Sequence, residues 1–272
     1  MDIKVDIRDR VAVVTGGAGI LCSCIAKALA AQGARVAVLD LKKDGAEKVA
    51  AEIVASGGAA IGLEADVLDK GSLEKAREII LREFATVDIL VNGAGGNHPR
   101  ATTGPDRSFF DLSTEDIQKV FNLNFLGTVL PTQVFGKVIV EKKKGIVINI
   151  SSMAAYTPLT KTIAYSAAKA AVSNFTQWLA VHFNQEYSRE IRVNAIAPGF
   201  LLTDQNRYLL IDAETGASTP RGRSVLNMTP MGRYGLPDDL CGAVLFLCSE
   251  AASFINGAVI PIDGGFQAYS GV

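Results

Sequence analysis

A tyrosine and a lysine four residues apart form the strongest candidate for acid–base chemistry in this sequence. Tyr165 and Lys169 lie in the segment YSAAK, and none of the other tyrosines has a lysine at this spacing. On a helix, residues four apart share a face. A cation about 5 Å away, at an effective dielectric constant of ~20, stabilises a phenolate by roughly 3 kcal/mol. The pair could therefore exchange a proton with an alcohol near neutral pH, with a lowered pKa for Tyr165.

A hydroxyl and an amide upstream of this pair could complete a site. Ser152 follows the apolar run GIVINI, and its hydroxyl could hold a substrate carbonyl or alcohol against Tyr165. Ser151 is the competing candidate, since neighbouring residues of a strand point to opposite sides. Asn124 lies in NLNFLGT, a helical pattern in which asparagine is not favoured. Its amide either bonds a neighbouring carbonyl or holds a water that relays protons.

A glycine-rich loop near the start of the chain indicates a phosphate site. The segment VAVVTGGAGI runs from an apolar strand through Gly16, Gly17 and Gly19 towards a helix. Glycines in such a loop make the tight turn, let the backbone approach a pyrophosphate and pack the helix on the strand. Cys22 stands where the third glycine of G-x-G-x-x-G belongs, and it is small enough for the packing role. The helix amides would then face the pyrophosphate; the alternative is a glycine-rich turn without a ligand.

An acidic residue after the next strand points to the cofactor. Asp40 ends ARVAVLD, where a carboxylate would accept hydrogen bonds from the adenine ribose and repel a 2′-phosphate. We therefore expect NAD, with NADP less favoured, although Lys42 and Lys43 follow closely. The alternative role for Asp40 is to cap a helix.

These residues need a scaffold, and the hydrophobic pattern predicts one. Seven short apolar runs alternate with longer helical segments, which is typical of a doubly wound parallel α/β sheet of the Rossmann type, with about seven strands and helices on both faces. With no linker or composition break, we expect one domain over residues 1–272. Connections at about 96–112 and 199–236 follow strand ends and are candidates for substrate loops.

Composition excludes several other classes of function. The net charge of −1 over 272 residues argues against a nucleic-acid surface. A charged start and the lack of a long uncharged apolar run predict a cytoplasmic protein outside the membrane. Four cysteines without a C-x-x-C pair, and two histidines, predict no metal site. There is no G-x-S-x-G segment to support a serine hydrolase.

Taken in order, the glycine loop, NGAG, Asn124, Ser152, YSAAK, PGFLLT and DGG resemble the short-chain dehydrogenase/reductases over nearly the whole chain. The resemblance implies that Tyr165 is the general acid/base, that Lys169 lowers its pKa and binds the nicotinamide ribose, that Ser152 orients the substrate and that Asn124 supports a proton relay. Ile20 and Cys22 replace two glycines of the family's loop. The cofactor-binding residues implied are Gly16, Gly17, Gly19, Ile20, Leu21, Asp40, Asp66, Val67, Asn92, Gly93, Ala94, Tyr165, Lys169, Pro198, Gly199, Leu201 and Thr203.

Segments that would shape the substrate pocket, among them NGAGGNHPRATT and PGFLLTDQNR, are similar to the branch of D-mannonate oxidoreductases, or fructuronate reductases. This implies a carboxylated sugar as substrate, whose carboxylate needs a cation or several donors. We expect Asn97, His98 and Arg100 to serve it, Arg100 or His98 first. The resemblance also implies a homotetramer, in keeping with the segment from Thr162 to Phe183, whose residues are apolar or small on nearly every face of the expected helix. The rival hypotheses are another sugar acid or polyol, such as gluconate, and a dinucleotide sensor without catalysis.

Overall fold

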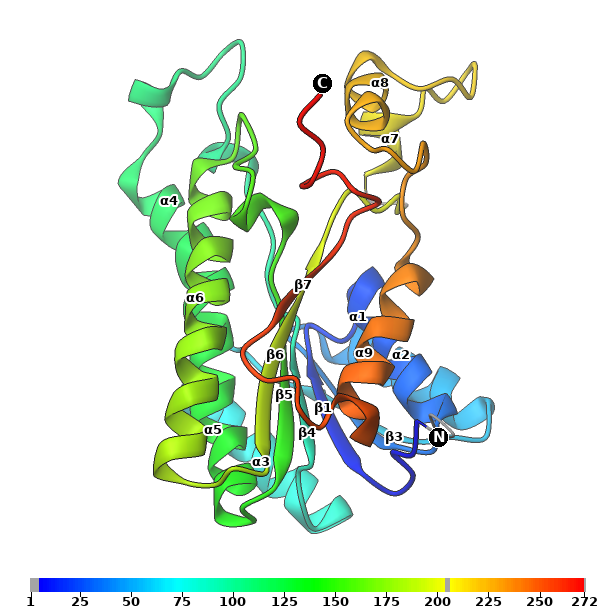
Figure 1. Cartoon of the computed structure of the whole chain (residues 1–272), viewed down its shortest axis with the longest axis vertical. Coiled ribbons are helices and arrows are strands. Elements are labelled where there is room, and N and C mark those ends of the chain that lie inside the picture. The colour runs from blue at the N-terminus through cyan, green and yellow to red at the C-terminus, as the bar shows by residue number, and fades with distance from the viewer. Residues whose placement is uncertain (1–4, 204–205, 272) are drawn as a thin grey trace.

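Seven parallel strands form one sheet in the computed structural model, which describes residues 5–203 and 206–271 (Figure 1). The strand order is β3-β2-β1-β4-β5-β6-β7. The chain therefore builds one half of the sheet outward from β1 and then returns to build the other half from β4. The strands are β1 Val11–Thr15, β2 Arg35–Asp40, β3 Ala59–Glu64, β4 Ile89–Asn92, β5 Gly145–Ile150, β6 Ile191–Pro198 and β7 Val259–Ile262.

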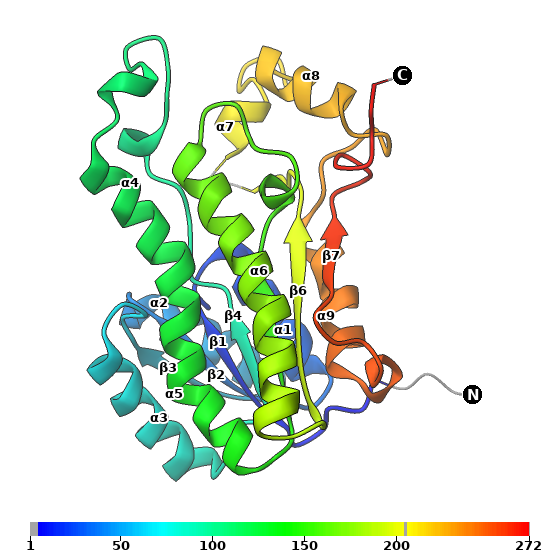
Figure 2. The ribbon, with the colours of Figure 1, turned by 60° about the vertical axis from the view of Figure 1, so that its left-hand side comes forward.

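Helices cover both faces of this sheet (Figure 2). On one face lie α1 (Ile20–Ala31), α2 (Lys43–Ala55) and α9 (Cys241–Cys248), and on the other α3 (Lys70–Phe84), α5 (Gly127–Glu141) and α6 (Ile163–Glu186). Alternate residues of β1 enter the two cores: Ala12 and Val14 face α1, whereas Val11 and Val13 face α3 and α5. Burial on both faces explains why the strands are apolar without alternation. The predicted doubly wound fold is confirmed.

The two long connections lie at the carboxyl ends of the strands (Figures 1 and 2). The first contains two short 3₁₀ turns, Pro99–Ala101 and Phe109–Asp111, and leads into α4 (Thr114–Phe121). The second contains α7 (Arg207–Leu210) and α8 (Pro220–Asn227), and the 3₁₀ turn η5 (Pro237–Leu240) follows it before α9. Ligands of doubly wound sheets bind at this edge, beside the point where strand order reverses.

One helical stretch, Thr114–Glu141, is long and apolar enough to cross a membrane by length and composition, with a mean hydropathy of 1.3. It comprises α4, a π-helical turn at Asn122–Leu126 and α5. Half of its apolar window is buried inside the protein, and Val134, Phe135 and Ile139 pack in the core against the sheet. Packing of this kind is that of a core helix.

Candidate active site

A cavity of about 530 Å³ opens at the carboxyl ends of the central strands. The loops after six of the seven strands contribute to it, together with α6. Most residues predicted from the sequence to bind the cofactor or to act in catalysis line this cavity: Gly16, Gly19, Ile20, Leu21, Asp40, Asp66, Val67, Gly93, Ala94, Ser152, Tyr165, Lys169, Pro198, Gly199, Leu201 and Thr203.

The glycine loop is shaped by two close approaches. Gly16 has φ of 62°, and a Cβ there would lie 2.8 Å from the backbone of Ala94. A Cβ on Gly17 would lie 2.6 Å from Cγ1 of Val38, so Gly17 packs the loop against β2 and does not itself line the cavity. Both positions therefore require glycine, one for its backbone conformation and one for space.

The first turn of α1 offers free amides to the cavity. Gly19 is the N-cap residue, no side chain accepts a hydrogen bond there, and the first turn contains no acidic residue. The positive end of the helix dipole is thus left for an external anion. This arrangement fits a pyrophosphate.

Cys22 occupies the space that the missing glycine would leave. Its side chain is 4% exposed and lies directly against Gly93, at the end of β4. Burial raises the pKa of the Cys22 thiol to about 12, so the sulfur is a neutral packing group. The helix keeps its packing on the sheet because Gly93, the residue opposite, has no side chain.

Asp40 ends β2 with its carboxylate in the cavity lining. One carboxylate oxygen accepts from the Ala18 amide at 3.1 Å and the other from the Lys42 amide at 3.1 Å. Lys43 pairs with Glu47 at 3.5 Å on the next turn of α2. The carboxylate is therefore held by backbone donors and has lone pairs left for ribose hydroxyls.

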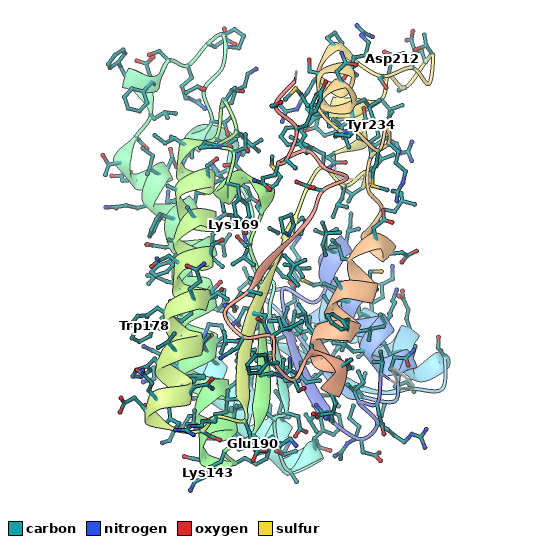
Figure 3. All side chains as sticks on the ribbon, viewed as in Figure 1. Lys143, Lys169, Trp178, Glu190, Asp212 and Tyr234 are labelled. Atoms are coloured by element: carbon teal, nitrogen blue, oxygen red, sulfur yellow. The ribbon has the colours of Figure 1, made fainter. Side chains whose placement is uncertain are left out.

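Tyr165, Ser152 and Lys169 meet at one side of the cavity, on α6 and at the end of β5 (Figure 3, where Lys169 is labelled). The Ser152 hydroxyl and the Tyr165 phenol both line this side of the cavity, and the serine acts to lower the pKa of the phenol. The Lys169 ammonium lies 5.7 Å from the centre of the Tyr165 ring and donates to the Ile150 carbonyl at 2.7 Å. An acid/base group, a hydroxyl donor and a cation are thus adjacent.

The pKa of Tyr165 departs from the sequence-based expectation. Burial raises the pKa of the phenol, and Ser152 acts in the opposite direction without reversing it. Burial also lowers the pKa of Lys169 to about 8. Desolvation is the largest cause of both shifts, because neither group lies on an exposed helix face.

The structure separates the two neighbouring serines. The Ser151 hydroxyl pairs with that of Ser173 at 2.7 Å and donates to the Lys169 carbonyl at 3.1 Å. Both partners of the Ser151 hydroxyl thus belong to α6, although Ser151 borders the cavity. Ser152 is the serine that faces Tyr165.

Asn124 lies in the π-helical turn and is fully buried. Its amide nitrogen donates to the carbonyls of Val120 and Gly96, both at 2.7 Å, and its oxygen accepts from the Gly96 amide at 3.1 Å. These bonds match the alternative of a satisfied polar side chain. Gly95 lies beside it: a Cβ there would be 2.6 Å from Oδ1 of Asn124 and 3.3 Å from Nζ of Lys169.

Besides Gly17 and Asn124, four predicted residues do not line the cavity. The amide of Asn92 is buried in the sheet and donates to Asn149 and Thr132, both at 2.9 Å. Asn97 donates to Thr102, His98 accepts from the Arg100 amide, and Arg100 pairs with Asp116 at 2.9 Å. These last three side chains therefore hold the loop after β4.

Several lining residues were not predicted from the sequence, notably Gly95, Gly96, Leu123, Phe200 and Asn206. The glycine pair that ends NGAGG was the available signal for Gly95 and Gly96. Asn206 closes the loop after β6, since its amide donates to the Leu201 carbonyl at 2.8 Å and its oxygen accepts from the Thr203 amide at 2.9 Å. That bond pattern has no signature in the sequence.

Comparison with known proteins finds similar oxidoreductases over nearly the whole chain. A family model described as enoyl-(acyl carrier protein) reductase matches residues 18–267. An uncharacterized oxidoreductase of Haemophilus influenzae is 51% identical over 98% of this chain and 96% of its own length. A crystal structure from Haemophilus influenza, provisionally named a D-mannonate oxidoreductase and containing NAD, superposes with a TM-score of 0.92 at 51% identity, covering 98% of each chain. D-threitol dehydrogenase of Mycolicibacterium smegmatis is 36% identical over 98% of this chain and 96% of its own length.

Proposed function

This chain belongs to the short-chain dehydrogenase/reductase family, and we propose that it interconverts D-mannonate and D-fructuronate with NAD in the cytoplasm. Family membership makes it an NAD(P)-dependent dehydrogenase or reductase, which removes the hypothesis of a sensor without catalysis. The observation that carries the proposal is the meeting of Ser152, Tyr165 and Lys169 in the cavity that Asp40 and the glycine loop also line.

Different residues of the cavity would bind different parts of the cofactor. The amides of α1 and the loop at Gly16 and Gly19 would hold the pyrophosphate, and Asp40 would bind the adenine ribose. Asp66 and Val67 would border the adenine, and Thr203 with the Leu201 backbone would hold the carboxamide. NAD, when bound, supplies the acceptor or donor of a hydride. Asp40 favours NAD over NADP because its carboxylate would repel a 2′-phosphate.

Tyr165 exchanges the proton of the reaction. In alcohol oxidation the phenolate oxygen takes the hydroxyl proton, and in ketone reduction the phenol returns it to the carbonyl oxygen. Ser152 donates a hydrogen bond to the same substrate oxygen and so orients it. Lys169, held by the Ile150 carbonyl, places its positive charge beside the phenol and stabilises the phenolate against burial.

The substrate carboxylate needs a cation. Lys169 is the only basic side chain in the cavity lining among the residues described, and it belongs to the acid/base group. The sequence-based candidates Arg100, His98 and Asn97 lie on the connection after β4, at the same edge of the sheet as the cavity. We assign the carboxylate to Arg100 first, which would exchange its bond with Asp116 for one to the substrate.

A polyol is the second candidate substrate class, because the relative named D-threitol dehydrogenase is 36% identical over nearly the whole of both chains. Both substrates are secondary alcohols and would use the same Tyr165 chemistry. They differ in the carboxylate, so the residues after β4 would distinguish them.

The outer face of α6 supports assembly into a homotetramer. Ile163, Trp178 and Val181 are 49%, 57% and 56% exposed, and Trp178 projects away from the sheet (Figure 3). A helix that covers a sheet and faces only water is expected to be polar on that side. A second copy of the chain would bury these residues.

A substrate panel tests the proposal. The purified protein is mixed with NADH and, separately, D-fructuronate, a keto acid derived from gluconate and a ketone derived from threitol, and loss of NADH absorbance is followed. The proposal predicts the highest kcat/KM with D-fructuronate, and D-mannonate should be oxidised with NAD in reverse. A preference for the neutral ketone would move the assignment to a polyol.

A further inference from the structure

Three side chains that could ligate a metal meet outside the active site. Cys24 lies in the second turn of α1, Asp238 in η5 and Cys241 at the start of α9. Cys24 Sγ is 3.3 Å from Cys241 Sγ and 2.8 Å from Oδ1 of Asp238, and the three ligand atoms lie within 4.8 Å of one another. Asp238 and Cys241 are three residues apart on consecutive helical turns, so they share a face opposite Cys24.

The local packing holds these groups in place. Leu240 lies between Asp238 and Cys241 in the sequence, and it is fully buried in the hydrophobic core to which α1 also contributes. The neighbouring Asp239 is not free to act as a ligand, because it binds Arg233 through both oxygens at 2.6 and 2.9 Å. Asp238, by contrast, forms no ion pair in the described part of the chain, and its printed partner is the Cys24 thiol. An acidic group without a cation thus lies between two thiols.

The donor set suits a soft divalent cation. Zinc binds thiolates at about 2.3 Å and carboxylates at about 2.0–2.2 Å in a tetrahedron, which separates two sulfur ligands by about 3.8 Å. The observed 3.3 Å between the sulfurs requires them to move apart by about half an ångström, within the reach of small side-chain rotations. A disulfide would instead require the sulfurs to approach by more than 1 Å and would leave Asp238 without a role.

We propose that Cys24, Asp238 and Cys241 form a binding site for a soft divalent cation such as Zn²⁺, with water as the fourth ligand. Each metal bound would displace the protons of the two thiols, so that two thiolates and one carboxylate coordinate the ion and two protons are released to solvent. Burial and the adjacent carboxylate raise the pKa of the Cys24 thiol, which makes uptake dependent on this proton release. The sequence predicted no metal site, because its four cysteines form no C-x-x-C pair and it has only two histidines.

Metal at this position would link α1 to α9 on one face of the sheet. The N-terminus of α1 lines the cofactor cavity, whereas Cys24 lies on the side that contacts η5. The inference stands on these three side chains and is independent of the substrate assigned above.

Cobalt is the probe of choice, because Co²⁺ bound to thiolates in a tetrahedral site absorbs visible light. Untagged, reduced and chelator-treated protein is titrated with Co²⁺ and then with Zn²⁺ as competitor. The proposal predicts one equivalent of Co²⁺ with thiolate charge-transfer absorption, displaced by Zn²⁺. Cys24→Ser and Cys241→Ser should abolish the absorption, and Asp238→Asn should weaken binding more than about tenfold.

Cys248→Ala is the matched control, since Cys248 is buried elsewhere in α9 and should leave the absorption unchanged. Circular dichroism of each variant confirms that it is folded. Absence of a thiolate band in the native protein, or an undiminished band in folded Cys24→Ser, would overturn the proposal. So would recovery of Cys24 and Cys241 as a disulfide together with no cobalt uptake after reduction, which would establish a redox pair instead.

Discussion

The sulfur of Cys22 fills the space that a side chain at Gly93 would need, so that a Cβ built on Gly93 would collide with it. Cys22, on α1, replaces a glycine of the phosphate loop, and Gly93 directly follows β4 opposite it. The close contact that the loop glycine usually permits is thus preserved by a glycine on the other side. This pairing explains how the cavity keeps its shape with a cysteine in the first helix.

The pairing predicts that Gly93→Ala is severely damaging and that Cys22→Gly relieves it. We expect Gly93→Ala to weaken NAD binding more than about tenfold or to unfold the protein, because overpacking of a full core costs about 1–3 kcal/mol or more. The double variant should recover part of the loss, limited by the Thr15 carbonyl, which would lie 3.0 Å from the new Cβ. Calorimetry with NAD and denaturant unfolding measure both effects.

Gly242→Ala in α9 is the control for this prediction, since a Cβ there meets no atom within 4 Å. It should be neutral or slightly stabilising. Equal stability and NAD affinity for Gly93→Ala and the native protein would show that Cys22 does not constrain position 93.

Asp40 is expected to set the preference between NAD and NADP. In Asp40→Asn the single side-chain oxygen can keep one of the two bonds from the Ala18 and Lys42 amides, while the charge that repels a 2′-phosphate is removed. The ratio of kcat/KM for NADPH to that for NADH should rise by at least about tenfold. Glu64→Gln, at the exposed end of β3 and in register with Asp40, is the matched control. An unchanged ratio in Asp40→Asn would reject the assignment.

Lys169 should make stability depend on pH in a definite direction. Burial lowers the pKa of Lys169 from 10.5 to about 8, so between these values the unfolded chain binds one more proton than the folded chain. Stability should therefore rise with pH across this window, by at most about 3 kcal/mol, and the burial penalty is fully present below pH 8. Lys169→Met should lack this component when urea unfolding is compared near both ends of the window.

Lys137→Met, which changes an exposed lysine of α5, is the control for the pH series. It should leave the pH dependence of unfolding as in the native protein. Parallel pH curves for Lys169→Met and the native protein would mean that Lys169 is charged in the folded state throughout.

Arg100 is expected to bind the substrate carboxylate. Arg100→Met should raise KM for D-fructuronate at least about tenfold while leaving KM for NADH and for a neutral ketone within about twofold. A merely structural role, through the bond to Asp116, would impair both ketones alike. Arg107→Met, on the same loop and bonded to the Pro99 carbonyl, serves as the control.

Features that depend on residues close together in the sequence could be predicted from it. Alternating apolar runs and helical segments predicted the doubly wound sheet. A strand buried on both faces is a continuous run of apolar residues, and such a run can be recognised within a few positions of the sequence. Residues at strand ends, such as Asp40 and Ser152, could be placed because parallel strands end at one edge. The choice of Ser152 over Ser151 needed the side-chain directions that only the structure gives.

Properties that depend on contacts between distant segments were not predictable. The raised pKa of Tyr165 arises from its partial burial in the cavity wall, which the helical spacing of Tyr165 and Lys169 does not reveal. The pairing of Arg100 with Asp116 and the meeting of Cys24 with Cys241 join elements whose relative positions are set by the whole fold. The loop contacts of Gly95 and Asn206 have the same origin.

The most direct test of the account measures D-fructuronate-dependent oxidation of NADH by the native protein and by Tyr165→Phe, with NAD binding measured by calorimetry in both. The account predicts turnover by the native protein, and loss of more than about a hundredfold in Tyr165→Phe with NAD affinity retained, because the phenylalanine ring keeps the packing but cannot transfer a proton. Near-native turnover in Tyr165→Phe would contradict the assignment of Tyr165 as the acid/base, and no turnover of D-fructuronate by native protein that binds NAD would contradict the assigned substrate.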